Sequence, residues 1–207
     1  YNYLPKATCF EDFYDKYIDE VQRVAENIMQ KISLSQEERA KFNPLPMRSF
    51  LIDDCIDNKT EYNNGGARYK WSIINFAGLI NVVDAMLTVK DFIFDSKSVD
   101  AYEFLNKLKD NDEEFLSKCR KTKLCFGTDE EYANALVQKL SHDVFSILDN
   151  KTPYLGEKFL PASIQYMSQV MAGKAIGATP DGRRAGEPLC DSLGAIFGKD
   201  TKGPTAL

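Results

Sequence analysis

The spacing of apolar side chains over residues 10–41 predicts the longest helix of the chain. Apolar residues recur at intervals of three and four, from Phe10 through Val21 to Ile32, which places them on one face of an α-helix. Thr8 and Glu11 have the spacing of a capping box at the start of this helix. The polar run over residues 33–38 offers a second start, so the segment is either one helix or two helices separated by a break.

The same pattern predicts shorter helices over residues 49–56, 77–92, 98–108, 113–120 and 128–150. In the segment 77–92 the polar residues sit three or four apart on one narrow face of an otherwise apolar helix, namely Asn81, Asp84, Thr88 and Asp91. Aromatic and β-branched residues predict one strand over residues 68–76 and a second over 162–170. Two strands separated by mostly helical sequence indicate an α/β fold, whose sheet we expect to be completed by chain outside these residues.

Charge and composition exclude several classes of protein. The 207 residues carry a net charge of −5, which argues against a nucleic-acid partner. No stretch approaches the roughly 20 apolar residues of a membrane helix, so no membrane partner is expected. The five cysteines lack CxxC spacing and there is one histidine, so we expect no metal site and predict the reduced thiols of a cytoplasmic protein.

The segment Thr179-Pro180-Asp181-Gly182-Arg183-Arg184 carries the most specific local pattern. Pro-Asp-Gly is a turn triplet, in which proline fixes φ, aspartate bonds its own backbone and glycine allows a positive φ. The two arginines that follow present planar forks for carboxylates or backbone carbonyls. They form either a clamp for an anion or substrate, or a rigid corner that ties neighbouring elements together. The residues by themselves favour the rigid corner.

Residues 177–189, followed by Gly198-Lys199-Asp200 and Gly203-Pro204-Thr205-Ala206, closely resemble the glycyl radical enzymes of the pyruvate formate-lyase group. Three other blocks also resemble that family: residues 50–56 leading into 65–69, residues 77–86, and residues 126–132. Thr128 stands where the family usually has Asn, and Cys190 where Ala is expected. The resemblance therefore spans nearly the whole chain.

The resemblance implies a ten-stranded α/β barrel built from two five-stranded halves and wrapped in helices. Residues 1–207 would be a helix-rich part of one such barrel domain, with few of its strands. In this family an activating enzyme, which uses S-adenosylmethionine and an iron–sulfur cluster, removes a hydrogen atom from one backbone glycine. The radical then passes to a cysteine inside the barrel, and members cleave pyruvate with coenzyme A, eliminate water, amines or sulfite, or decarboxylate aryl acids.

Two essential parts of that mechanism do not map to this sequence. The radical cysteine lies in a Gly-Cys-containing loop, expected before residue 1, and the radical glycine in an Arg-Val-x-Gly-Tyr-like motif, expected beyond Leu207. We therefore expect this segment to hold no catalytic residue, cofactor or metal, and to be inactive in isolation. Its expected partners are the activating enzyme and the remainder of the barrel, in a homodimer when full length. The alternative is a stand-alone, non-catalytic remnant that acts as a binding or partner module.

The resemblance also implies that the strand before the signature segment faces the barrel interior. Alternation along this strand would place one set of side chains on one side, namely Gln165, Met167, Gln169 and Met171, and the other set on the opposite side, namely Ile164, Tyr166, Ser168 and Val170. By analogy we favour the first set, and predict that Gln165, Met167 and Gln169 contact the substrate. The reaction subclass, acyl transfer or a dehydratase- or lyase-type elimination, is not readable from these residues.

Overall fold

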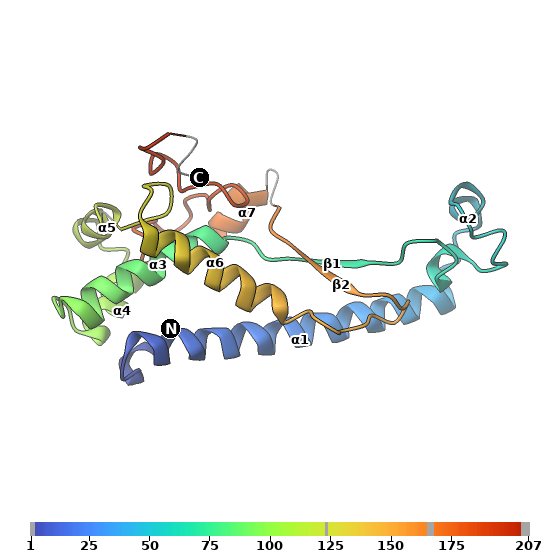
Figure 1. Ribbon diagram of the computed structural model, residues 1–207, viewed down its shortest axis with the longest axis horizontal. Helices are drawn as coiled ribbons and strands as arrows, with labels where there is room; N and C mark the ends of the chain where they lie inside the picture. Colours follow the sequence, from blue (N-terminus) through green and yellow to red (C-terminus); the bar gives the residue numbers. More distant parts are fainter. Residues whose placement is uncertain (1–2, 123, 165–167, 204–207) are drawn as a thin grey trace. The chain divides into compact units, whose positions relative to one another are not determined.

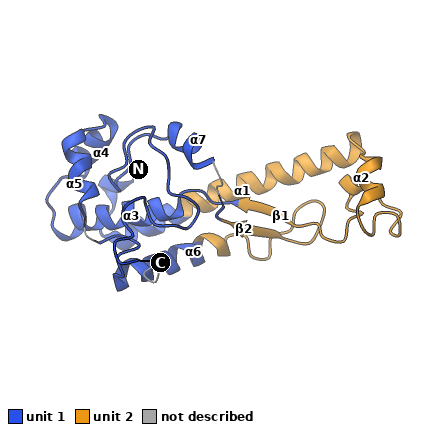
Figure 2. Ribbon diagram, turned by 90° about the horizontal axis from the view of Figure 1, so that it is seen from above, with its two compact units in different colours: residues 1–18, 75–143, 163–207 blue, residues 19–74, 144–162 orange. Residues whose placement is uncertain are grey.

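The computed structural model describes residues 3–122, 124–164 and 168–203. The chain divides into two compact units, shown in Figure 2. Unit 1 comprises residues 1–18, 75–143 and 163–207, and unit 2 comprises residues 19–74 and 144–162. Figure 1 labels the elements in chain order. None of the helices in the described part of the chain has the length and apolar character that spanning a bilayer requires.

Helix α1 (Phe10–Phe42) is one continuous helix of 33 residues, so the break proposed near residues 33–38 is wrong. That run contains no Gly or Pro, and its polar residues make helix-compatible contacts. Lys41 pairs with Glu37 at 2.7 Å, for example, the i,i+4 spacing that supports a helix. The capping box predicted at the start of α1 pairs Thr8 with Glu11. In the structure the Thr8 backbone N–H instead donates to the Asp12 carboxylate at 2.9 Å, so the predicted partner is wrong.

Unit 1 gathers the helices around a core of aromatic and aliphatic side chains. It contains the first part of α1, the helices α3 (Leu79–Val89), α4 (Ala101–Lys109), α5 (Glu113–Arg120) and α7 (Ser168–Lys174), and the first part of α6 (Glu131–Ser146). Helix α3 is buried along almost its entire length and continues into a π-helical turn, Lys90–Asp95. The rings of Phe104 and Phe115 meet edge to face, with centroids 5.0 Å apart, and this contact fixes α4 against α5.

Unit 2 contains the rest of α1 and α6, the short helix α2 (Pro46–Leu51) and the strands β1 (Ser72–Asn75) and β2 (Phe159–Ala162). The two strands pair in parallel, and the Ser72 N–H donates to the Lys158 carbonyl at 3.1 Å. Gln36 of α1 donates to the Ser72 hydroxyl at 2.7 Å, in a buried position. One face of β1 therefore packs on α1, whereas Ile73 on the other face is exposed.

The predicted strand over residues 162–170 is wrong over most of its described length. The structure has β2 at Phe159–Ala162 and helix α7 at Ser168–Lys174, while residues 165–167 lie outside the described residues. A short apolar run can satisfy both strand and helix periodicity. Helix α7 packs closely against the segment at Glu187 through Gly173, because a Cβ at that residue would stand 2.1 Å from the Glu187 carbonyl oxygen.

The other predicted elements are present with shifted ends. The strand predicted over residues 68–76 shortens to β1, and the helix over 113–120 matches α5. The helix predicted over 49–56 is α2, which begins at Pro46, a residue suited to the first turn of a helix. The helix predicted from residue 98 begins at Ala101, with Asp100 as its side-chain cap. The helix predicted over 128–150 is α6, Glu131–Ser146.

Candidate functional site

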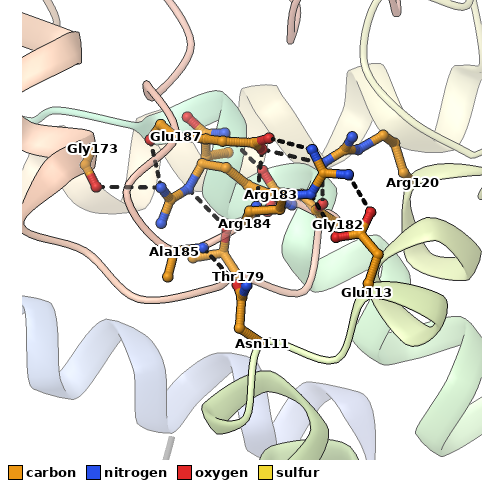
Figure 3. A network of polar contacts seen from close by, with 12 residues as sticks. Asn111, Glu113, Arg120, Gly173, Thr179, Gly182, Arg183, Arg184, Ala185 and Glu187 are labelled. Carbon is orange, nitrogen blue, oxygen red and sulfur yellow. Dashed lines mark hydrogen bonds and ion pairs between the residues drawn. The ribbon is translucent and has the colours of Figure 1, made fainter.

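The signature segment forms a closed turn in unit 1, seen from close by in Figure 3. The Gly182 N–H donates to the Thr179 carbonyl at 3.0 Å, and the Thr179 N–H donates to the Arg183 carbonyl at 3.0 Å. Gly182 has φ +87°, and a Cβ at this position would lie 2.6 Å from the backbone nitrogen of Arg120. Only glycine therefore lets the turn lie directly on the end of α5.

Arg183 is a buried guanidinium, with 6% of the residue exposed. It donates to the carbonyls of Glu187 at 2.6 Å, Ile176 at 3.3 Å and Gly173 at 3.4 Å, to the Thr179 hydroxyl at 3.1 Å, and to the Gly177 carbonyl. These acceptors come from the end of α7 and from both sides of the turn (Figure 3). Arg183 thus joins several backbone segments through hydrogen bonds, which is the rigid-corner arrangement.

Arg184 points to the surface and joins the turn to α5. Its guanidinium forms a two-pronged ion pair with Glu113, through Nε at 2.6 Å and through Nη2, which raises the pKa of Arg184 and lowers that of Glu113. Glu187 accepts from the Arg184 backbone N–H at 2.9 Å and from Arg120 at 3.1 Å. Arg120 also donates to the Gly182 carbonyl at 2.7 Å (Figure 3).

Asn81 of α3 holds the inner side of the same turn. Its amide nitrogen donates to the Asp181 carboxylate at 2.7 Å, and its carbonyl oxygen accepts the Cys190 N–H at 2.8 Å. Asn81 is 5% exposed and Asp181 4% exposed. An amide both donates and accepts, which a carboxylate or an aliphatic side chain cannot do. Asn81 therefore joins the turn and the segment after it to the buried face of α3.

We predict that Asn81→Leu opens this region, because it leaves a buried carboxylate oxygen and a buried N–H without partners. The expected cost is about 2–4 kcal/mol of local stability. Hydrogen exchange of residues 179–190, measured by mass spectrometry in the full-length protein, checks it. Asn27→Leu, on the exposed surface of α1 in unit 2, is the matched control. Unchanged exchange in the Asn81 variant would contradict the role given to this residue.

A cavity of about 530 Å³ lies beside the turn, within unit 1. Its walls come from α3, α5, α7 and residues 181–199, and include Asn81, Arg120, Gln169, Asp181, Leu189 and Lys199. The Gln169 side-chain oxygen is buried and has no hydrogen-bond partner among the described residues. The Leu189 N–H donates to the Gln169 backbone carbonyl at 3.2 Å. That oxygen has almost no accessible surface, so it lies inside the wall and does not face the open space of the cavity.

Asp84 lies one turn after Asn81 on α3 and is 3% exposed. One carboxylate oxygen accepts the Phe126 N–H at 2.9 Å, while the other is buried without a partner among the described residues. Burial raises the pKa of Asp84 to about 7, despite the opposing effects of the Phe126 N–H and Lys199. A carboxyl group in this state changes charge near neutral pH.

Four of the five cysteines lack the features of a reactive nucleophile. Cys55, Cys119, Cys125 and Cys190 are buried, and burial raises the pKa of each thiol, that of Cys119 to about 12. The described residues include no group of three or more His, Cys, Asp and Glu side chains placed to hold a metal ion. High thiol pKa values disfavour the reactive thiolate.

The structure brings only part of the predicted site together. Thr179, Pro180, Asp181, Gly182, Arg183 and Arg184 form the turn, and Gln169 lines the adjacent cavity from a helix instead of a strand. Gln165 and Met167 lie outside the described residues. The sequence did not predict that Asn81, Arg120 and Lys199 lie beside the turn. The narrow polar face of α3 was the available signal for Asn81.

Comparison with known proteins gives consistent matches along the chain. A family model described as "Pyruvate formate lyase-like" matches residues 1–173. Trans-4-hydroxy-L-proline dehydratase of Clostridioides difficile is 24% identical over 96% of this chain and 26% of its own length. Isethionate sulfite-lyase of Oleidesulfovibrio alaskensis is 28% identical over 96% of this chain and 24% of its own length.

Among solved structures, the glycerol-bound form of the B12-independent glycerol dehydratase from Clostridium butyricum superposes with a TM-score of 0.90. That match is 26% identical and covers 98% of this chain and 26% of the dehydratase. The chain thus spans about a quarter of the length of the curated relatives it matches.

Proposed function

Because the chain belongs to the pyruvate formate-lyase-like family of glycyl radical enzymes, we propose that it is one segment of such an enzyme and supplies part of its substrate-binding wall. The observation that carries this proposal is the cavity of about 530 Å³ beside the family turn, which Gln169 lines from α7. Ligand sites are concave and combine apolar walls with a few polar groups, as this wall does. Gln165 and Met167 belong to the same proposed contact region.

For the reaction we propose a lyase-type elimination from a small substrate. The relatives named above are two dehydratases and a sulfite-lyase, which supports elimination over the acyl transfer of a formate acetyltransferase. In this family the glycyl radical supplies hydrogen-atom abstraction. This chain contains neither a Gly-Cys loop nor an Arg-Val-x-Gly-Tyr-like motif, so in this proposal both radical-bearing residues belong to other parts of the enzyme.

The residues of this chain then shape and position the site. Arg183 and Asn81 fix the turn, and Gln169 on the cavity wall is a proposed substrate contact. The remainder of the ten-stranded barrel would pair with the two strands present here, since unpaired strand edges are templates for further strands. A radical-activating enzyme and a second copy of the full-length protein are the other proposed partners. The reduced cysteine thiols are in keeping with a cytoplasmic enzyme.

The test is anaerobic activation followed by electron paramagnetic resonance. The full-length protein, incubated with its activating enzyme and S-adenosylmethionine, should give a glycyl-type radical and convert a small hydroxylated substrate. The 207-residue chain treated in the same way should give no radical. A full-length protein that is activated under no condition, while the same activating enzyme works on a control substrate protein, would refute the proposal. A glycyl signal from the 207-residue chain would refute the proposed division of roles.

A further inference from the structure

A second pocket, of about 340 Å³, lies within unit 2, the orange part of Figure 2. Its walls come from the C-terminal half of α1, from the segment between Tyr62 and Ile73, and from Leu155. Gln36 and Ser72 are buried on this wall, and the Gln36 amide donates to the Ser72 hydroxyl at 2.7 Å. This bond joins α1 to β1 at the pocket and holds that part of the wall in place. The volume lies within the range of small-molecule sites.

The charges on this wall all have the same sign. Arg39 and Lys70 line the pocket, and no Asp or Glu side chain of the described residues does. The Arg39 Nε donates to the Ser35 carbonyl at 3.2 Å, while its two terminal nitrogens have no acceptor in the described part of the chain. Glu157 accepts the Lys70 backbone N–H at 3.2 Å, but no carboxylate among the described residues pairs with the Lys70 ammonium. In a protein with a net charge of −5, two cations without a counter-charge in one pocket indicate an anionic ligand.

Three aromatic side chains line the same pocket, namely Tyr62, Tyr69 and Trp71. The ring centroids of Tyr69 and Trp71 are 5.2 Å apart, and 67% of Tyr69 and 51% of Trp71 are exposed. Side chains two positions apart on an extended chain lie on the same side. Their exposed ring faces form a surface on which a flat aromatic ring can stack. The wall therefore suits a ligand that combines a flat ring with negative charge.

The balance of charge favours a phosphate monoester over a carboxylate. A phosphate monoester carries a charge of about −1.5 to −2 at neutral pH, which matches two cations, whereas a carboxylate neutralises one of them. The Arg39 guanidinium can bind two phosphate oxygens with its planar set of N–H donors, and the Lys70 ammonium adds a point charge.

We propose that this pocket of unit 2 binds a phosphate monoester attached to a flat aromatic ring. The phosphate is held by Arg39 and Lys70, and the ring stacks on Trp71 and Tyr69. A mononucleotide and an aryl phosphate are two sources of this chemistry. The site goes beyond the proposed function, which uses the cavity beside the turn in unit 1.

The experiment measures binding to the full-length protein without activation, by titration calorimetry under anaerobic conditions, with AMP and phenyl phosphate as the probes. AMP should bind about tenfold or more tightly than adenosine or inorganic phosphate, because each of these lacks one half of the ligand. Phenyl phosphate should likewise bind more tightly than benzoate. Binding of either probe with these preferences supports the proposal, and the tighter of the two identifies the source.

Substitutions on the wall test the assigned contacts. Arg39→Gln and Lys70→Gln should each weaken AMP binding about tenfold, because each removes a charge-assisted contact. Trp71→Leu should weaken it by a similar factor through lost stacking. Arg23→Gln is the matched control, since Arg23 lies on the exposed surface of the same helix and pairs with Glu20, and it should leave binding unchanged.

Three results would overturn the proposal. The first is that neither AMP nor phenyl phosphate binds, which would mean that another segment of the full-length protein fills the pocket. The second is that benzoate binds as tightly as phenyl phosphate, and the third is that Arg39→Gln and Lys70→Gln leave AMP binding unchanged. If Trp71→Leu fails to fold, the comparison of AMP with adenosine and with inorganic phosphate, together with the Arg39 variant, still decides the question.

Discussion

Raising the pH from 5 to 8 should destabilise unit 1 by about 3 kcal/mol through Asp84. In the unfolded chain this carboxyl has a pKa of 3.8, and in the folded protein burial raises the pKa to about 7. A raised pKa means that the stabilisation is fully present below pH 4 and is lost as the pH rises through 7. Each unit of difference corresponds to about 1.4 kcal/mol. The loss should therefore be spread between pH 4 and 7 and level off above that.

Asp84→Asn removes the titrating group while retaining an oxygen that can accept the Phe126 N–H. The variant should be more stable than wild type by about 2 kcal/mol at pH 8, and no more stable than wild type at pH 5, because its added amide hydrogens lack a partner. Denaturant unfolding of the full-length protein at pH 5, 6, 7 and 8 measures both effects. Asp110→Asn, at an exposed position, should leave the pH dependence unchanged. Parallel pH profiles for wild type and Asp84→Asn would show that Asp84 remains ionised over this range.

Replacing Arg183 should have the largest effect of any substitution in the turn. Its guanidinium satisfies four carbonyls and one hydroxyl, and no other side chain can reproduce that planar set of donors. Arg183→Lys keeps the charge but reaches fewer acceptors, so we expect a loss of about 3 kcal/mol. Arg183→Met leaves the acceptors without donors and should cost about 4–5 kcal/mol.

The measurement is hydrogen exchange across residues 173–189, together with the thermal midpoint of the full-length protein. Arg184→Lys is the matched control, because Arg184 lies at the surface in an ion pair with Glu113, and it should change the exchange far less. An Arg183→Lys variant as well protected as wild type would mean that a point charge suffices at this position. The stability of the turn would then not depend on the planar set of N–H donors that a guanidinium supplies.

Local signals in the sequence were sufficient for much of the fold. The bounds of α5 were predicted correctly, and α1 and α4 lie close to their predicted ranges, because apolar periodicity and capping residues act within one or two turns of a helix. The family turn was also evident, since Pro180, Asp181 and Gly182 each favour one backbone conformation. These features depend on neighbours in the chain, which the sequence displays directly.

Other features depended on partners distant in the chain. The run after Ala162 suits a strand or a helix equally, and the contact of Gly173 with Glu187 accompanies the helix. The sequence allowed Arg183 to be either a clamp for a ligand or a rigid corner between backbone segments. Its hydrogen bonds to backbone carbonyls favour the corner. Asn81 meets Asp181 across 100 positions of sequence, and no local pattern predicts that pairing. Local patterns were thus enough for the family resemblance, most helices and the turn. Which polar groups pair with one another could be read only from the folded chain, because burial and hydrogen bonding arise from contacts between distant segments.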